Sequence, residues 1–372
     1  MKVLKILYIT TIGLTMRFFP AFVKELLEQG HTVDIATNAE AEPVLPCYAE
    51  WGCKTYQIST SRSPFDPGNI KAIGQIKKLV EEGNYDIVHC HTPIAAACTR
   101  LACRNLRKKG VKVIYTAHGF HFYTGAPLQN WLIFYPIEKL CARWTDVLIT
   151  MNGEDYQRAK EKMPAQKVEY VPGVGIDVKR FSDVQIDIAA KRAELGIPED
   201  AFLLCSVGEL NANKNQEAII RAMAQLEQKN IHYMIAGIGD KEAYLRQLVQ
   251  ELHLDGRVHL LGYRRDVAEL CKAADLFVFP SYREGLPVSV MEAMAAGKAV
   301  VCSDARGNGD LVREGEGGFI VHNQDVAQYA QKIETLFNDR QLCHQMGQFN
   351  AQYIDGFTHA KVHAIMHKIY NG

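Results

Sequence analysis

The stretch LFVFPSYREGLPVSVMEAMAAGKAVVC, residues 276–302, contains a strand, a loop, a helix and a second strand in one short run. Leu276–Phe279 and Ala299–Cys302 are short apolar runs, as expected of parallel strands that are buried on both faces. Val288–Ala295 is predicted to be helical. Pro287 suits the helix start, because the N–H that proline lacks would be unpaired there in any case. This order is the repeating unit of a parallel sheet covered by helices.

The same alternation continues in both directions from this stretch. One series of predicted strands comprises Val3–Thr10, Thr32–Thr37, Thr55–Ile58, Ile87–His89, Lys112–Thr116, Val147–Thr150 and Val168–Val171. A second series comprises Phe202–Val207, Tyr233–Gly237, Val258–Leu261, Leu276–Pro280, Ala299–Cys302 and Gly318–Val321. The predicted helices include Phe19–Gln29, Ile70–Glu82, Pro93–Lys109, Asn215–Gln228, Lys241–Glu251, Arg265–Lys272, Val288–Ala295, Val326–Asn338 and much of 341–372. The pattern predicts an α/β protein made of two doubly wound, Rossmann-like domains.

The glycine-rich segment VPGVGIDVKRF, residues 171–181, separates the two series and is interpreted as a hinge. We therefore divide the chain into an N-terminal domain at 1–172 and a C-terminal domain at 173–355. Residues 356–372 are predicted to form a C-terminal helix that could pack back on the N-terminal domain.

The amino-acid composition indicates the general class of protein but little about its binding partners. The 372 residues are 48% hydrophobic and 23% charged, as in ordinary globular proteins, and a formal net charge of zero gives no sign of a nucleic-acid partner. The ten cysteines form no C-x-x-C pair, which argues against a zinc ribbon or a thiol redox site. The apolar N-terminus contains Lys5 and lacks a small-residue cleavage site, so it is interpreted as a first strand rather than a signal peptide. We expect a soluble, reduced, cytoplasmic protein.

The loop after Phe279 is a candidate anion site. The free amides of Gly285, Leu286, Val288 and Ser289 would head a helix next to a strand end, where backbone N–H groups and the helix dipole attract negative charge. Two carboxylates, Glu284 and Glu292, flank this helix start and suit hydroxyl groups better than phosphate. The alternative is an ordinary strand–loop–helix with two solvated glutamates.

Three further loops carry candidate residues. Lys214, in LLCSVGELNANKNQE at 203–217, could neutralise a pyrophosphate, although an ordinary surface lysine is the commoner case. His118, in YTAHGFHFYTG at 115–125, follows a strand end; such a histidine alone is more often structural. Gly13 lies in the first strand-to-helix loop, but no G-x-G-x-x-G fingerprint occurs in the chain. We therefore expect no NAD or FAD cofactor, and the absence of D-x-D gives no obvious paired-aspartate metal site.

Several segments in order resemble glycosyltransferase family 4, a group of retaining enzymes of the GT-B fold. The most specific is EGLPVSVME, with Glu284 and Glu292 eight residues apart, which resembles the E-x7-E signature of that family. The others are QGHTVDIAT, DIVHCHTP, YTAHG, VPGVGID, VGELNANKN, LGYRRDV and GGFIV. The resemblance covers nearly the whole chain and implies two domains facing across a cleft, the first binding the acceptor and the second the nucleotide-sugar.

The resemblance also implies roles for individual residues. Lys214 would contact the donor pyrophosphate, Glu284 the hydroxyls of the donor sugar, and Glu292 the ribose. His118 would lie beside the donor sugar, and Gly13 would let the first loop approach the donor phosphate and acceptor. The residues implied in catalysis are His118, Lys214 and Glu284. Those implied in donor binding are Gly13, Glu209, Asn211, Lys214, Tyr263, Arg264, Glu284, Gly285, Leu286, Pro287, Val288 and Glu292.

One position departs from the family pattern. Many relatives have arginine where this chain has Glu209, and a glutamate cannot clamp phosphate. Phosphate neutralisation would then depend more on Lys214 and the helix start, with Arg283 or Arg306 as possible substitutes.

The activity implied is transfer of a sugar, with retention, from a nucleotide donor, most simply a UDP-sugar. The acceptor would be a glycan or a polyprenyl-linked glycan in capsule or exopolysaccharide synthesis, and the sugar a hexose or N-acetylhexosamine. No metal is expected to take part. The alternatives are a GT-B nucleotide-sugar epimerase and, from another class, a two-domain sugar-binding protein.

The segment TRLACRNLRKKGVK, residues 99–112, carries cations without an acid among them. As an amphipathic basic helix it would suit an anionic membrane surface and a peripheral location at the inner face of the membrane. The alternative is a solvated helix face. The cations proposed for this contact are Arg100, Arg104, Arg107, Lys108 and Lys109.

Overall fold

The computed structural model describes residues 2–372, which form two compact units. The N-terminal unit comprises Met1–Val174 together with His359–Gly372, and the C-terminal unit comprises Gly175–Thr358. The first boundary lies inside the glycine-rich segment at 171–181, where Gly173 and Gly175 have φ angles of 79° and 82°. Only glycine adopts such angles without strain, which accounts for the composition of this segment.

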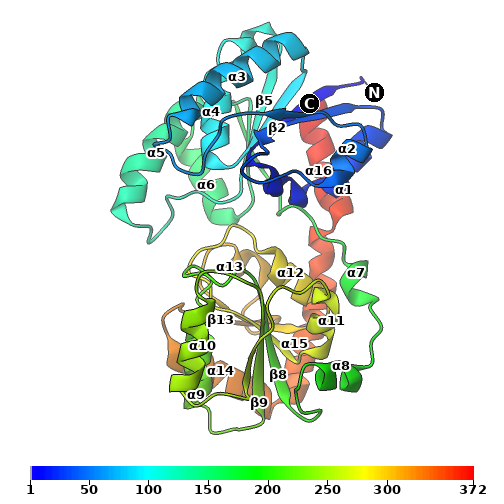
Figure 1. Ribbon diagram of the computed structural model, residues 1–372, viewed down its shortest axis with the longest axis vertical. Coiled ribbons are helices and arrows are strands. Elements are labelled where there is room, and N and C mark those ends of the chain that lie inside the picture. Colours follow the sequence, from blue (N-terminus) through cyan, green and yellow to red (C-terminus); the bar gives the residue numbers. More distant parts are fainter. Residues whose placement is uncertain (1) are drawn as a thin grey trace. The chain divides into compact units, whose positions relative to one another are not determined.

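The N-terminal unit contains a seven-stranded parallel sheet with strand order β3-β2-β1-β4-β5-β6-β7. Its strands are β1 (Lys5–Ile12), β2 (Thr32–Asn38), β3 (Thr55–Gln57), β4 (Ile87–His91), β5 (Lys112–Ala117), β6 (Val147–Thr150) and β7 (Lys167–Tyr170). Its helices are α1 (Pro20–Glu28), α2 (Pro46–Glu50), α3 (Gly68–Gly83), α4 (Pro93–Cys103), α5 (Leu128–Ala142), α6 (Gly153–Lys162) and α16 (His359–Asn371), with 3₁₀ segments η1 (Gly13–Phe18) and η2 (Leu106–Lys109). Separate apolar clusters fill the two faces of the sheet, and Figure 1 shows the helices on both sides.

The C-terminal unit repeats this plan with a six-stranded parallel sheet of order β10-β9-β8-β11-β12-β13. Its strands are β8 (Phe202–Val207), β9 (Ile231–Ala236), β10 (Val258–Leu260), β11 (Leu276–Phe279), β12 (Ala299–Ser303) and β13 (Gly318–Val321). Its helices are α7 (Lys179–Ser182), α8 (Ile188–Glu194), α9 (Gln216–Gln225), α10 (Glu242–Glu251), α11 (Val267–Ala273), α12 (Val288–Ala295), α13 (Asn308–Leu311), α14 (Val326–Asn338) and α15 (Arg340–Tyr353), followed by the 3₁₀ segment η3 (Ile354–Phe357). The predicted fold class of two doubly wound domains is confirmed.

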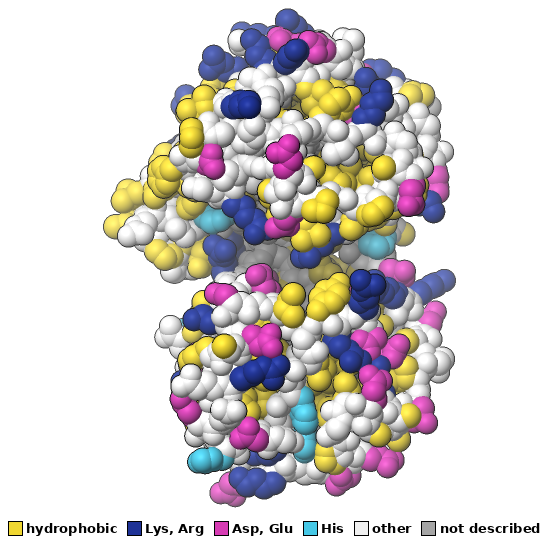
Figure 2. Space-filling model, in the orientation of Figure 1, with side chains coloured by type: hydrophobic (Ala, Val, Ile, Leu, Met, Phe, Trp, Pro, Cys, Tyr) yellow, Lys and Arg dark blue, Asp and Glu magenta, His cyan; other side chains and the backbone are white. Residues whose placement is uncertain are grey.

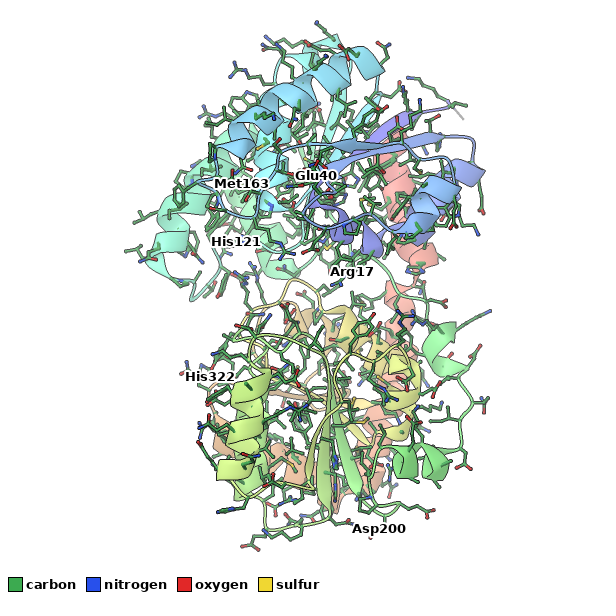
Figure 3. The ribbon with its side chains drawn as sticks, viewed as in Figure 1. Arg17, Glu40, His121, Met163, Asp200 and His322 are labelled. Carbon is green, nitrogen blue, oxygen red and sulfur yellow. The ribbon has the colours of Figure 1, made fainter. Side chains whose placement is uncertain are left out.

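Each sheet has a topological switch point, where neighbouring strands connect in opposite directions along the sheet. In the N-terminal unit it lies between β1 and β4, and in the C-terminal unit between β8 and β11. In open α/β sheets, ligands bind outside the carboxyl ends of the strands at such a point. In Figure 3, Asp200, which precedes β8, lies at the end of the C-terminal unit away from His322, which follows β13.

The C-terminal helix α16 belongs to the N-terminal unit and packs against α1 (Figure 1). Glu25 of α1 contacts His363 Nδ1 at 2.5 Å and His367 Nε2 at 2.6 Å. Near the chain end, the Tyr370 hydroxyl lies 2.9 Å from that of Tyr8 and 2.6 Å from Nδ1 of His89, inside the unit. These buried polar contacts tie the last turns of the chain to β1 and β4.

All ten cysteines are free thiols, and nine of them are buried. None of the helices between residues 2 and 372 has the length and apolar composition that crossing a bilayer requires.

Candidate active site

Two loops lie side by side at the switch point of the C-terminal unit, one after β8 and one after β11. The Tyr282 amide donates to the Asn213 carbonyl at 2.8 Å, and Asn213 Nδ2 donates to the Arg283 carbonyl at 2.9 Å. Asn215 adds a bond from Nδ2 to the Pro280 carbonyl at 3.1 Å. The two loops are therefore one hydrogen-bonded assembly. Sequence reasoning missed these two asparagines, since their partners lie about seventy positions away.

Helix α12 begins directly after the second loop. Pro287 is its N-cap residue, with φ −75° and ψ 118°, and Val288 is the first helical residue. The amides of Gly285, Leu286 and Val288 donate no hydrogen bond to any group between residues 2 and 372. Unpaired amides at a helix N-terminus carry partial positive charge and bind anions.

The cation predicted from the first loop lies at this helix start. Lys214 Nζ is 2.7 Å from Glu284 Oε1, and it also lies 4.7 Å from the ring centroid of Phe279. Both side chains of the pair are largely shielded from water, with exposed fractions of 22% and 10%. The structure thus brings together the predicted phosphate-binding lysine and the predicted sugar-binding glutamate.

Glu292 is a second carboxyl group at the same end of the sheet, one turn inside α12. No hydrogen bond or ion pair from any residue between 2 and 372 reaches its carboxylate. Burial raises its pKa to about 7, and the charge of Arg180 opposes this shift only in part. A buried acceptor without a partner is costly, so Glu292 is poised to accept hydrogen bonds from a ligand.

Residues 306 and 307 contact the backbone of the loop that contains Glu284. Arg306 Nε donates to the Glu284 carbonyl at 3.2 Å. Gly307 has a φ of 81°, and a Cβ atom there would lie 2.0 Å from the Gly285 carbonyl oxygen. No other residue fits between these two backbones.

Glu209 lies in the loop after β8. Its side chain is exposed, while its carbonyl accepts a hydrogen bond from Gln216 Nε2 at 3.1 Å. Asn211 Oδ1 accepts from the Lys214 amide at 3.0 Å, so Asn211 shapes the turn that carries the lysine. Arg283 and Arg306 are the two candidates to replace the arginine that many relatives have at position 209. Arg306 donates to the Glu284 carbonyl, whereas no contact from residues 2–372 holds the Arg283 guanidinium.

The loop after β10 holds Tyr263 and Arg264, two of the residues that the resemblance implies in donor binding. Tyr263 is exposed to 67%, as a ring available for stacking would be. Arg264 is held by carboxylates, with Nε 2.8 Å from Asp266 Oδ1 and Nη2 2.9 Å from Glu194 Oε1. Arg264 therefore orders the loop, and Tyr263 is its accessible side chain.

In the N-terminal unit, His118 follows β5 and belongs to a group of neighbouring histidines. Its Nε2 lies 3.1 Å from Nδ1 of His91, and His91 Nε2 is buried without a partner in the described chain. Burial lowers the pKa of His118 to about 4 and that of His91 well below its usual value. Both rings are therefore neutral at pH 7 and offer hydrogen bonding rather than charge.

A cavity of about 330 Å³ opens at the switch point of the same unit. Thr11 and Thr92 line it from the loops after β1 and β4, and their hydroxyl oxygens are 2.6 Å apart. Thr92 has a φ of 65°, an outlier for a β-branched residue and a kind of strain that gathers at functional sites. Arg62 and His121 also line the cavity, and Figure 3 labels His121 at the edge of the unit where its strands end.

Gly13 has a packing role within the N-terminal unit. Its amide donates to the Glu42 carbonyl at 3.0 Å, and a Cβ atom would lie 2.3 Å from that oxygen. The close approach that requires glycine is therefore to residues 42–44 of the chain itself.

Two of the five cations proposed for a membrane surface are engaged inside the protein. Arg100 is fully buried, with Nη1 2.8 Å from Glu138 Oε2, and lies over the ring of Tyr115. Arg107 is bonded to Asp146 through Nε at 3.0 Å. The prediction was wrong for Arg100, because this residue lies on the buried side of α4. Arg104, Lys108 and Lys109 are exposed.

The chain matches two protein-family models. Residues 5–152 match the model described as "Glycosyl transferase 4-like", and residues 187–353 match "Glycosyl transferases group 1". A relative from Bacillus subtilis (strain 168), "Putative glycosyltransferase EpsD", is 38% identical over 99% of this chain and 96% of its own length. The protein belongs to glycosyltransferase family 4. It is therefore a glycosyltransferase, as the resemblance implied.

Other relatives of this glycosyltransferase extend the comparison. The UDP-Gal:alpha-D-GlcNAc-diphosphoundecaprenol alpha-1,3-galactosyltransferase of Escherichia coli is 27% identical over 79% of this chain and 77% of its own length. A crystal structure of Anabaena Alr3699/HepE in complex with UDP superposes with a TM-score of 0.83, 19% identity, and coverage of 99% of both chains. The latter likeness shows that the glycosyltransferase has the GT-B fold.

Proposed function

We propose that this glycosyltransferase transfers a hexose or N-acetylhexosamine from a UDP-sugar, with retention, to a lipid-linked glycan in cell-surface polysaccharide synthesis. The observation that carries the donor assignment is the meeting of Lys214, Glu284 and the unpaired amides of α12 at the switch point of the C-terminal unit. This arrangement offers positive charge for a diphosphate and a carboxylate for sugar hydroxyls. Support for the base comes from UDP in the related Anabaena structure.

The donor is proposed to lie along the carboxyl ends of β8 and β11. The uracil ring stacks on Tyr263, and the ribose hydroxyls donate to Glu292. The diphosphate accepts from the amides of Gly285, Leu286 and Val288, and Lys214 turns from Glu284 toward the phosphates. Glu284 then accepts hydrogen bonds from the sugar. Arg283, whose guanidinium is uncommitted, supplies the second cation that Glu209 cannot.

The chemistry follows from charge separation in the donor. The bond between C1 of the sugar and the β-phosphate oxygen breaks, and Lys214 with the α12 amides stabilises the departing diphosphate. The acceptor oxygen bonds to C1 on the face that the diphosphate leaves, and its proton passes to the departing phosphate oxygen. Neither glutamate forms a covalent intermediate. His118 contacts the sugar as a neutral hydrogen-bonding group.

The same protein groups account for a metal-independent reaction. Lys214, Arg283 and the helix start supply positive charge where a divalent ion would otherwise be needed. We expect turnover to persist when EDTA is present.

The acceptor is proposed to bind in the 330 Å³ cavity of the N-terminal unit. Thr11, Thr92 and His121 offer hydrogen bonds to sugar hydroxyls, and Arg62 offers a cation to a phosphate. A lipid-linked acceptor is supported by the Escherichia coli relative, whose name gives alpha-D-GlcNAc-diphosphoundecaprenol as its acceptor. With ten free thiols, the protein is proposed to work in the reducing cytoplasm, at the inner face of the membrane.

Two measurements test the proposal. UDP should raise the Tm, because a ligand that binds only the folded state stabilises it by mass action. A panel of UDP-sugars incubated with a diphosphopolyprenyl glycan should then give one product whose anomeric configuration, read by NMR, equals that of the donor. A Tm unchanged by every nucleoside diphosphate would refute the donor site, and an inverted product would refute retention.

A further inference from the structure

Helix α5 is unlike the other helices of the N-terminal unit because apolar side chains occupy both of its faces. At 100° per residue, Trp131, Phe134, Tyr135, Glu138 and Cys141 fall on one side, and they pack against the core of their own unit or lie buried there. The opposite side is apolar as well, although it faces solvent. Helices that are hydrophobic all round are normally covered on all sides.

The exposed side forms a continuous stripe along the whole helix, which we call the α5 stripe. The exposed fractions of Leu128 and Leu132 are 72% and 67%, and those of Ile137 and Leu140 are 44% and 46%. Ile133, exposed to 38%, lies between them. Figure 2 shows hydrophobic side chains gathered where Figure 1 places α5. Contiguous apolar surface of this kind usually marks a contact with a membrane or a partner.

Cations border the α5 stripe at its C-terminal end. Lys139 and Arg143 project from the exposed side of the same helix, and both are exposed. The Arg143 carbonyl accepts a hydrogen bond from Arg107 Nη1 at 3.0 Å, which brings η2 to this helix end. The exposed side chains of Lys108 and Lys109 thereby lie close to the same place.

The acidic groups of this region are already neutralised. Glu138, the acid within α5, is buried in its pair with Arg100, and Asp146 is held by Arg107. The exposed side of α5 and the neighbouring η2 therefore present apolar and basic groups with no exposed acid between residues 104 and 109 or between 128 and 143.

We propose that the α5 stripe docks the protein on an anionic lipid bilayer. Leu128, Leu132, Ile137 and Leu140 enter the interface between headgroups and acyl chains, while Lys139 and Arg143 bind lipid phosphates, as in other amphipathic surface helices. A second copy that docked through the same stripe would cover it but would bring only like charges to these cations. The charge pattern therefore favours the bilayer.

The location of the stripe agrees with the proposed function, on which this inference rests. Phe134, from the buried side of α5, lines the proposed acceptor cavity and stacks on His121 at 4.5 Å between ring centroids. A bilayer that contacts the outer side of α5 lies one helix diameter from that cavity. A polyprenyl-linked acceptor could then stay in the membrane while its glycan reaches Thr92.

Vesicle sedimentation tests the inference with a matched pair of variants. The test variant is Leu132→Gln/Ile137→Gln, whose residues are exposed to 67% and 44%; the control is Val3→Gln/Ile188→Gln, at 62% and 43%. We expect the unaltered protein and the control to pellet with vesicles of equal parts phosphatidylglycerol and phosphatidylcholine. The test variant should bind at least tenfold more weakly. Lys139→Glu/Arg143→Glu and 0.5 M NaCl should each weaken binding too.

The measurement separates this inference from the donor assignment. The increase in Tm caused by UDP should be the same in every variant, because none of the substituted residues lies at the proposed donor site. The inference is overturned if the unaltered protein does not pellet, or if the test variant pellets equally well. It is also overturned if the unaltered protein is a dimer, Leu132→Gln/Ile137→Gln is a monomer, and neither form binds vesicles.

Discussion

Lys214 Nζ lies 2.7 Å from Glu284 Oε1, so the lysine proposed to hold the diphosphate is already paired with the glutamate proposed to hold the sugar. The pair keeps the ammonium group at the start of α12 before any donor arrives. It also holds the glutamate carboxylate in one orientation. In the proposed complex the nucleotide-sugar replaces this contact, because its phosphates take the ammonium group and its hydroxyls take the carboxylate, and both groups are already at the site.

Removing this ammonium group should slow transfer far more than it weakens folding. For Lys214→Ala we expect kcat to fall by roughly a hundredfold, about 3 kcal/mol, since the departing diphosphate loses its nearest side-chain cation. Steady-state kinetics with saturating acceptor measure this. Lys272→Ala, in the same unit, is the control, because its Nζ bonds only to the Ser182 carbonyl, at 3.4 Å. Unchanged turnover in Lys214→Ala would remove the lysine from the mechanism.

Glu292, which is proposed to bind the ribose, also makes the stability of the fold depend on pH. Its pKa is raised to about 7 by burial, so between its ordinary value and pH 7 the folded protein keeps a proton that the unfolded chain has released. The free energy of unfolding therefore falls as pH rises through this range, and the full cost, about 3 kcal/mol, is present by pH 8.

The variant Glu292→Gln should remove that cost. We expect its Tm to exceed that of the unaltered protein by about 6–12 °C at pH 8, and the difference to vanish below about pH 3.5, where the carboxyl is protonated in both states. Affinity for UDP should nevertheless fall about tenfold at pH 8, because an amide accepts ribose hydroxyls less strongly than a carboxylate. A Tm difference that stays constant with pH would contradict the assigned titration.

The sequence predicted well the loop and helix that are proposed to bind the donor, because their signals are local. Helix α12 and the positions of Glu284, Gly285 and Lys214 follow from strand ends, a proline at a helix start and loop composition within short windows. The predicted bounds of α12 agree with the structure, since Pro287 and Gly297 mark both ends in the sequence itself.

What the sequence did not predict depends on distant contacts or on strain. Tyr8 and Tyr370 meet across 362 positions, and no periodic pattern indicates that contact. Helix α5 was not predicted because its apolar residues surround the axis and produce no helical period. Asn215 is the N-cap residue of α9, but its side chain accepts no hydrogen bond from the helix amides. Its φ of 52° places it in the left-handed region, and its side chain donates to the Pro280 carbonyl instead.

The backbone contact between Gly307 and Gly285 gives a test of loop geometry that touches no charged group. In Gly307→Ala the new Cβ would meet the Gly285 carbonyl oxygen at 2.0 Å, at a φ of 81° that alanine also disfavours. We expect the loop to shift and the Tm increase produced by UDP to be largely lost. Gly309→Ala is the control, because nothing lies within 4 Å of its Cβ position. Equal UDP responses in both variants would show that the loop does not hold the diphosphate.

Arg62 allows the acceptor cavity to be tested separately from the donor site. Its guanidinium is exposed to 72% and lies 3.3 Å from Glu42, a weak pairing that an acceptor phosphate would outcompete. For Arg62→Ala we expect the KM for a diphosphate-linked acceptor to rise about tenfold, with kcat and the Tm response to UDP unchanged. Lys78→Ala is the matched control, since Lys78 is exposed to 75% and lies 3.8 Å from Glu82. An acceptor that lacks the diphosphate should be used equally well by Arg62→Ala and the unaltered protein. If instead the substitution impaired both acceptors alike, Arg62 would act on the glycan or on the cavity wall, and the phosphate would bind elsewhere.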